Sequence, residues 1–289
     1  MMRYQLISNH RHEFPVVIQC RALKVKASGY YAWRRRPPSQ RTRENDRLLL
    51  EISKIHKDSR QTYGSPRISV VLQERGYGAS RPRVARLMKN HGILAKTKRK
   101  FKVTTHSKHR YPISPNLVAQ NYSADKPNAI WSSDITYIRT KKGWLYLTVI
   151  QDFFNREIVG WAMSSRLTAA TTTIPALNQA CGRQKPEAGL IFHSDRGVQY
   201  ACDSFRKLLS KNKMVQSMSG KGNCYDNAVT ESFFHTLKTE LTHHEKYETK
   251  TQAMESIFEY IELFFNRKRK HSTLGYKTPV EYKLLRKAA

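Results

Sequence analysis

The sequence predicts an α/β fold with a mixed five-stranded sheet flanked by helices, preceded by all-α helix-turn-helix segments. Two observations predict it. From residue 129 on, three strand-like apolar stretches follow one another, and helix and strand patterns then alternate. Before that residue the chain is strongly basic, and its apolar residues recur at helical spacing. The 289 residues suffice for one large domain or for several small ones.

Positive charge is concentrated in the first part of the chain. Residues 1–120 contain 27 Lys and Arg against 6 Asp and Glu, whereas residues 121–289 contain 25 against 16. A basic half with helical periodicity predicts binding to a polyanion, of which duplex DNA or RNA is the usual one. The alternative, a solvated basic surface or tail, is less favoured because the apolar residues keep their spacing.

Cysteines and apolar runs exclude other classes. The four cysteines form no C-x-x-C pair, so a zinc site and a disulfide framework lack support. No apolar run approaches the ~18 residues of a membrane span, and charged residues interrupt the N-terminus, so we expect no membrane partner and an intracellular location.

Residues 1–38 are expected to form a first helix-turn-helix segment. Residues 14–23 and 29–36 have helical patterns, and Ser28 between them is a candidate N-cap. The second helix of such a motif lies in the major groove. It would present two candidate DNA-contacting residues, Arg34 and Arg35. The alternative is a structural helix pair whose arginines only face solvent.

Residues 39–95 are expected to form a second helix-turn-helix domain, in which 39–45 are a linker. Asn45 would begin a helix with Leu48, Ile52 and Ile55 inward. Ser65-Pro66 starts another helix, and Ser80 caps a third that ends near Gly92. The outward face of the third helix carries the candidate DNA contacts Arg81, Arg83, Arg86 and Lys89.

Residues 96–128 are expected to be a basic linker, followed by a core with a C-terminal helical extension over residues 129–289. The expected strands are 130–139, 144–153, 157–163, 190–193 and 214–218, and the helices between them are 169–181 and 204–211. Lys141-Lys142-Gly143 is a hairpin turn. This order of elements is that of a ribonuclease-H-like fold, which by itself carries no function.

Three carboxylates are the candidate catalytic and metal-binding residues. Asp134 lies within the first strand, Asp195 follows a buried strand, and Glu231 lies on a helix, with 35 residues between Asp195 and Glu231. Ligands of α/β folds bind at strand ends, and two or three carboxylates suffice for Mg²⁺ in phosphoryl transfer. Taken singly, each acid is more often structural. Asp152 and Asp226 are rivals, and His193 could orient a water or lie in the core.

The helix around Glu231 has a polar, partly basic stripe suited to a DNA backbone. Asn227, His235 and Lys238 lie on this stripe, and we count Asn227 and Lys238 as DNA-binding candidates. The preceding loop, 219–225, contributes Lys221 as another candidate. It lacks the spacing of a P-loop, so binding of a nucleoside triphosphate is not supported.

With these residues in place, the chain resembles the OrfB-type transposases of the IS-three family of bacterial insertion sequences, which have a retroviral-integrase-like core. The matching stretches cover nearly the whole chain: 12–15, 29–33, 63–67, 131–138, 193–200, 217–238 and 266–282. The resemblance implies a D,D-35-E site, which Asp134, Asp195 and Glu231 match, with two Mg²⁺ or Mn²⁺ ions. It implies nicking at element ends and 3′-OH attack on DNA without a covalent enzyme intermediate.

The resemblance also implies partners: the terminal repeats of the element, target DNA, further copies of the chain, and an upstream DNA-binding protein or frameshift fusion partner. It places the protein in the bacterial cytoplasm, associated with the nucleoid. Two other functions remain open at this point. One is a non-catalytic DNA-binding regulator on the same scaffold, which would not need the three carboxylates. The other is a nuclease that only hydrolyses, which would not join strands.

Overall fold

The computed structural model describes residues 2–96, 111–119, 121–220 and 228–287. The chain divides into two compact units, residues 1–53 and 54–289. The helix α4, Gln40–Asp58, belongs to both. The predicted domain boundaries stay predictions.

The first unit has a small helical core. Helices α1 (Met2–Asn9), α2 (Val16–Ala22) and α3 (Ala27–Arg35) bury Ile7, Cys20 and Tyr30 against one another. The helix α1 was not predicted, because its only buried residue is Ile7 and it has no apolar stripe. The prediction of Ser28 as N-cap is wrong: the backbone N–H of Tyr30 donates to the carbonyl of Lys26, so α3 begins before Ser28.

Two further predictions for the helical part need correction. Residues 40–45 are the first turns of α4 and not a linker, and the backbone N–H of Thr42 donates to the Ser39 hydroxyl at 3.1 Å to start the helix. Gly64, not Ser65, precedes α5 (Ser65–Glu74). The inward stripe of α4 is confirmed, because Leu48, Ile52 and Ile55 are buried.

The helices α5 and α6 (Arg81–Asn90) form a helix-turn-helix pair in the second unit. Ser80 precedes α6, as predicted, although its side chain makes no capping hydrogen bond. The two helices bury an apolar set of five residues: Ile68, Leu72, Val84, Leu87 and Met88. Gly92 follows α6 in the left-handed region at φ +64°, a conformation that favours glycine.

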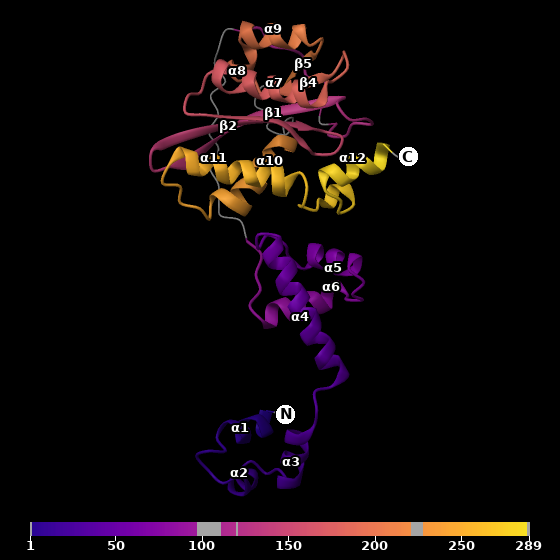
Figure 1. The fold of residues 1–289 in the computed structure, drawn as a ribbon, viewed down its shortest axis with the longest axis vertical. Helices are drawn as coiled ribbons and strands as arrows, with labels where there is room; N and C mark the ends of the chain where they lie inside the picture. The colour runs from indigo at the N-terminus through magenta and orange to yellow at the C-terminus, as the bar shows by residue number, and fades with distance from the viewer. Residues whose placement is uncertain (1, 97–110, 120, 221–227, 288–289) are drawn as a thin grey trace. The chain divides into compact units, whose positions relative to one another are not determined.

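The rest of the second unit is built around a five-stranded mixed sheet with the order β3-β2-β1-β4-β5, as predicted (Figure 1). Its strands are β1 (Ile130–Thr140), β2 (Gly143–Asp152), β3 (Ile158–Ser164), β4 (Ile191–Ser194) and β5 (Val215–Met218). The hairpin of β1 and β2 is antiparallel and closes at Thr140 opposite Gly143, which confirms the predicted turn. Strand β4 pairs parallel with both β1 and β5.

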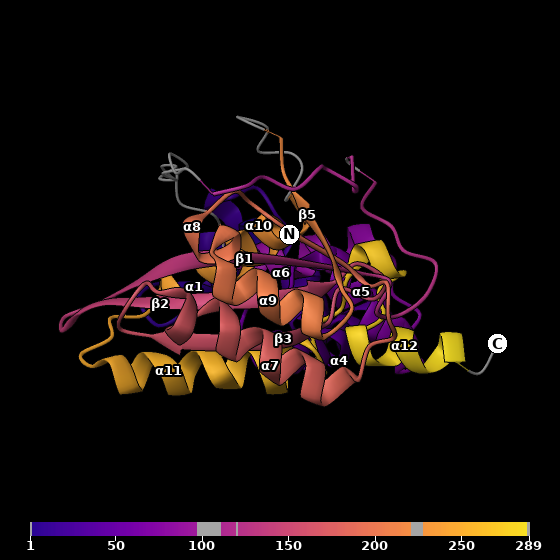
Figure 2. The same cartoon turned by 90° about the horizontal axis from the view of Figure 1, so that it is seen from above.

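Helices cover both faces of the sheet. On one face lie α7 (Thr173–Gln184), α8 (Val198–Ala201) and α9 (Asp203–Lys211), with a short 3-10 turn, Ala169–Thr171, before α7. Seen from above in Figure 2, α8 and α9 lie over the strands. Trp131, Phe192 and Phe205 are among the buried residues of this core. The single predicted helix 169–181 therefore breaks into two pieces, and α8 was not predicted.

Helices α10 (Ala228–Leu237) and α11 (Lys250–Phe258) lie on the other face. Each continues as a π-helical turn, α10 to Thr242 and α11 to Phe265. Phe233, Leu237 and Phe265 pack there against the β1–β2 hairpin. Ile257 and Ile261 are buried in this core, whereas Phe258 is 43% exposed and its ring lies edge-on to that of Trp161. A 3-10 turn, Ser272–Leu274, and α12 (Pro279–Lys287) complete the chain.

The C-terminal segment joins the sheet to the helix-turn-helix pair. The side chain of Asn266 donates to the carbonyl of Ile158 and accepts from its N–H, which extends the edge of β3. The Tyr63 hydroxyl donates to the carbonyl of Lys268 at 3.0 Å and accepts from the N–H of Lys270 at 2.7 Å. These bonds hold the chain before α5 against residues 266–270.

Candidate active site

The strand register brings the two aspartates together. Asp134 lies in the middle of β1, opposite Val149 of β2. On the other side of β1, Ser133 pairs with Ser194, the last residue of β4. Asp195 follows Ser194 directly, so it leaves the sheet beside Asp134. Both carboxylates are partly exposed at this point.

Glu231 reaches the same place from α10. The hydroxyls of Thr230 and Ser132 are hydrogen-bonded at 2.6 Å in the buried interior. This bond fixes the first turn of α10 on β1 two residues from Asp134. Phe233, one turn along, is buried beneath the helix. Glu231 itself is exposed, so packing does not fix its rotamer.

The three carboxylates act on one another electrostatically. Burial raises the pKa of Asp134 well above its usual value, and the negative charges of Asp195 and Glu231 raise it further. Partial burial of its carboxyl group and the charge of Asp195 likewise raise the pKa of Glu231. The N–H of Ile135 and the ammonium of Lys238 oppose the rise at Asp134. The site therefore concentrates negative charge that a cation would relieve.

Hydrogen bonds orient two of the carboxylates. The N–H of Ile135 donates to Asp134 Oδ1 at 2.7 Å, and the N–H of Gly197 donates to Asp195 Oδ1 at 2.9 Å. A Cβ atom at position 197 would lie only 2.9 Å from that same Oδ1, so a side chain would push the carboxylate away. Gly197 is thus a positioning residue.

Behind the carboxylates lies a polar wall that sequence reasoning missed. The buried hydroxyls of Ser133 and Tyr200 are 2.8 Å apart. Burial raises the pKa of Tyr200 well above its usual value, with Asp134 and Asp195 adding to the rise. Two serines in a strand that is otherwise buried were the available signal, because a buried hydroxyl needs a partner.

The rival residues have structural roles. Asp152 is 1% exposed and accepts from the backbone N–H groups of Asn128 and Phe154, so it holds the turn after β2. His193 is buried, with Ser217 and Ser219 hydroxyls within hydrogen-bond distance of its ring nitrogens, so it is a core histidine. Asp226 lies outside the described residues.

The candidate DNA contacts are only partly brought together. Lys238 lies at the carboxylates, since the charge of Asp134 raises its pKa against the lowering effect of burial. The helices α3 and α6 present exposed Arg34, Arg35, Arg81, Arg86 and Lys89, with Arg83 partly exposed. Lys221 and Asn227 lie outside the described residues.

The donor set fits a hard divalent cation, because carboxylate oxygens are the ligands that Mg²⁺ and Mn²⁺ prefer. Across the described residues, no three His, Cys, Asp or Glu side chains are arranged as ligands of a single ion. The fit therefore rests on the chemistry of the donors and on their shared excess of negative charge. Of the described helices, none is long and apolar enough to cross a bilayer.

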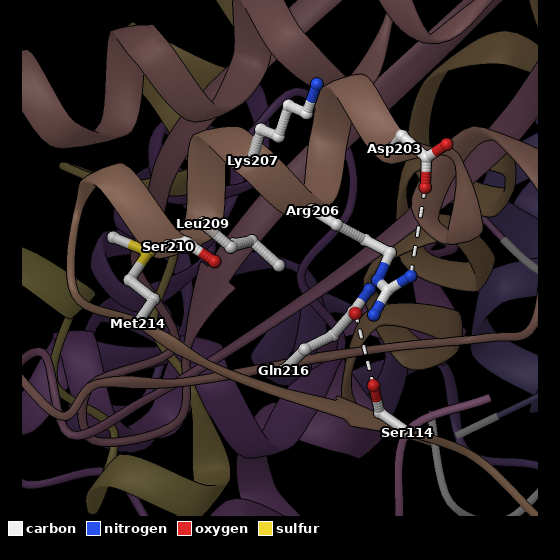
Figure 3. A pocket seen from close by; sticks show the side chains of 8 residues that line it. All are labelled: Ser114, Asp203, Arg206, Lys207, Leu209, Ser210, Met214 and Gln216. Carbon is white, nitrogen blue, oxygen red and sulfur yellow. Dashed lines mark hydrogen bonds and ion pairs between the residues drawn. The ribbon is translucent and has the colours of Figure 1, made fainter. Parts of the chain in front are cut away.

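A cavity of about 480 Å³ lies elsewhere, between α9 and β5 (Figure 3). Arg206 points across it and contacts Asp203 at 3.8 Å, and the Ser114 hydroxyl donates to Gln216 Oε1 at 3.1 Å. None of the three carboxylates lines this cavity, so it is separate from the candidate active site.

Family models match three parts of the chain. Models described as integrase core domain match residues 124–224 and 231–285, and a model described as HTH-like domain matches residues 43–101. The structure is weakly similar to the HTLV-2 integrase catalytic core domain in complex with magnesium, at 18% identity and a TM-score of 0.43 over 55% of this chain and 98% of that one. A likeness of that size adds nothing to the assignment.

Sequence relatives are much closer. An uncharacterized 31 kDa protein of insertion element IS600 from Shigella sonnei is 44% identical over 91% of this chain and 97% of its own length. The transposase InsF for insertion sequence IS3A from Escherichia coli is 39% identical over 97% of this chain and 98% of its own length.

The integrase core and the helix-turn-helix pair define a DNA transposase, a polynucleotidyl transferase that binds DNA. The chain belongs to the IS3 family of insertion-sequence transposases, which confirms the predicted fold and the resemblance seen in the sequence.

Proposed function

We propose that Asp134, Asp195 and Glu231 hold two divalent cations, Mg²⁺ or Mn²⁺, with which the chain nicks DNA at the ends of its element and joins the 3′-OH to target DNA. One observation carries the proposal. Carboxylates from β1, from the end of β4 and from α10 converge: the charges of Asp195 and Glu231 raise the pKa of Asp134, and the charge of Asp195 raises the pKa of Glu231. Such a cluster is stable when ionised only if positive charge is bound among its members.

The cations, when bound, neutralise the phosphate, activate the attacking hydroxyl and stabilise the leaving oxygen. The residues of the chain hold the cations and orient the carboxylates. Ile135 and Gly197 each donate a backbone N–H to one carboxylate oxygen, which orients Asp134 and Asp195. Lys238 adds a positive charge on the same side, where it would meet a DNA phosphate.

The test is a cleavage and joining assay on labelled element-end DNA with Mg²⁺ or Mn²⁺. We expect the native chain to nick and to join, and Glu231→Gln to lose both activities by about a hundredfold or more, a barrier increase of roughly 2.7 kcal/mol. The matched control is Glu255→Gln, an exposed glutamate on α11, which should behave as native. Full activity of Glu231→Gln would refute the assignment.

The same assay separates the two alternatives. A nuclease that only hydrolyses would nick without joining, and a regulator would bind without either reaction. The intact carboxylate trio favours catalysis, because a regulator has no use for three converging acids.

We further propose that the transposase works as a multimer on DNA, together with an upstream DNA-binding protein or as its frameshift fusion. The mechanism must hold two element ends at once, which supports more than one copy. Light scattering of the chain with element-end DNA tests this, and a strictly monomeric complex that joins two ends would contradict it. Repeating the assay with the fused upstream domain tests the partner.

A further inference from the structure

A second cavity, of about 330 Å³, lies beside α10. Val229, Ser232 and Thr236 of that helix form one wall, so the cavity adjoins the residue that follows Glu231. The opposite walls come from segments distant in sequence: Arg67 of α5, Arg156 after β2, and residues 269–273. No Asp or Glu is among the described residues that line it.

Three guanidinium groups converge in this cavity. Burial lowers the pKa of His271 well below its usual value, and the positive charges of Arg269, Arg67 and Arg156 lower it further. Arg269 is paired with Glu240. Within the described part of the chain, Arg67 and Arg156 have no carboxylate at ion-pair distance. The cavity therefore holds positive charge in excess.

Three residues that line the cavity each have a buried polar atom without a hydrogen-bond partner among the described residues. Arg156 uses Nη2 to donate to the carbonyl of Tyr122 at 2.7 Å, but its buried Nη1 donates to no described group. His271 is 8% exposed, and its Nε2 likewise has no partner. The same holds for Gln151 Oε1. Leaving buried polar atoms unsatisfied is costly, and such atoms point to a ligand or water.

We propose that this cavity binds a phosphate group of the DNA strand that passes the helix carrying Glu231. A phosphate would balance the excess charge of Arg67 and Arg156, which line the cavity, and guanidinium groups commonly bind phosphate. A bound anion would oppose the lowering of the His271 pKa and favour the protonated ring, in which Nε2 is a donor. A water that accompanies the phosphate would donate to Gln151 Oε1. The assignment to DNA rests on the proposed function, because that function makes DNA the substrate.

The decisive experiment is phosphate neutralisation, position by position. The full chain is bound without divalent cation to a set of element-end oligonucleotides, each with one methylphosphonate. We expect one position, or two adjacent ones, to weaken binding of the native chain about tenfold. In Arg156→Gln, the methylphosphonate at that position should no longer weaken binding. The slope of log K against log salt should become less negative by about 0.9. Arg183→Gln, which removes an equal charge from α7 outside the cavity, should keep the native pattern.

A second measurement does not depend on DNA. At constant ionic strength, inorganic phosphate in place of chloride should raise the Tm of the native chain and leave that of Arg156→Gln nearly unchanged. Arg156→Lys keeps the charge but lacks Nη1, so it should give an intermediate shift and serves if Arg156→Gln does not fold.

The outcomes separate the sources of the phosphate. The proposal is supported if a methylphosphonate at one DNA position weakens binding of the native chain and this effect is absent in Arg156→Gln. Stabilisation by inorganic phosphate without such a position overturns the assignment to DNA in favour of a free anion, and the absence of both overturns the site. Because binding is measured without divalent cation, a failure of the Glu231→Gln assay would not affect this result.

Discussion

Arg269 donates two hydrogen bonds to Glu240 in the interior, from Nη2 to Oε1 at 2.7 Å and from Nε to Oε2 at 2.9 Å, and both side chains are less than a tenth exposed. The hydroxyl of Tyr260 donates to the same carboxylate at 2.7 Å. The pair joins the end of α10 to the segment that follows α11, so it ties the catalytic helix to the C-terminal part of the chain.

Glu240→Gln should lower the free energy of unfolding by about 3–5 kcal/mol, because it leaves the charge of Arg269 buried and uncompensated. Adding Arg269→Met should recover most of the loss, since the pair is then replaced by neutral groups of similar size. Urea unfolding of the native chain, both single variants and the double variant measures the coupling. A double variant as unstable as the two losses added together would show that the pair is not coupled.

Asp152 should make stability depend on pH. Burial raises the pKa of Asp152 from 3.8 to about 6. Between those values the folded chain binds more protons than the unfolded chain, so the contribution is fully present below pH 4 and is lost as pH rises through 6, by about 3 kcal/mol. Asp152→Asn should flatten this part of the pH profile of urea unfolding. An unchanged slope would contradict the assignment.

The close approach of α7 to β3 should make Gly160 intolerant of a side chain. A Cβ atom at position 160 would lie 2.7 Å from the Cβ of Ala180 and would also clash with the carbonyl of Ala176. Gly160→Ala should therefore cost about 1–3 kcal/mol. A Cβ atom at Gly182, which lies in α7, would meet nothing within 4 Å. Gly182→Ala should therefore stabilise the folded chain by up to about 1 kcal/mol. Thermal unfolding of both variants is the test, and equal shifts would be inconsistent with the packing.

The exposed face of α6 should meet DNA phosphates. Arg86→Gln should weaken binding to element-end DNA, and should reduce the slope of log K against log salt by about 0.9. Arg75→Gln is the matched control, because Arg75 belongs to the same helical pair but contacts Asp58 at 3.9 Å. Binding titrations from low to moderate salt give the slopes. Identical slopes for the two variants would place the DNA elsewhere.

The sheet was predictable because its signals are local. The Lys141-Lys142-Gly143 turn and the alternation on either side specify the β1–β2 hairpin, and a buried strand that ends in Ser194-Asp195 specifies the edge where the acids meet. The predicted roles of the three carboxylates remain predictions, although the fold brings the residues together.

Other features depend on contacts that no window of sequence contains. The N-terminus of α4 looked like a linker because its residues are polar and charged, yet a helix tolerates such residues on exposed faces. The hydroxyl pair of Ser132 and Thr230 joins residues 98 apart. The arginine cavity takes its walls from residues near 67, 156 and 270, so only the folded chain could reveal it.

The bonds of Tyr63 to Lys268 and Lys270 also set an order of events during synthesis. Lys268 follows Tyr63 by 205 positions, which take roughly 10–40 s to translate at ~5–20 residues per second. The pair of α5 and α6 therefore leaves the ribosome and can fold long before the backbone groups that anchor it exist. A nascent chain stalled before residue 268 would carry these DNA-binding helices untethered from the sheet.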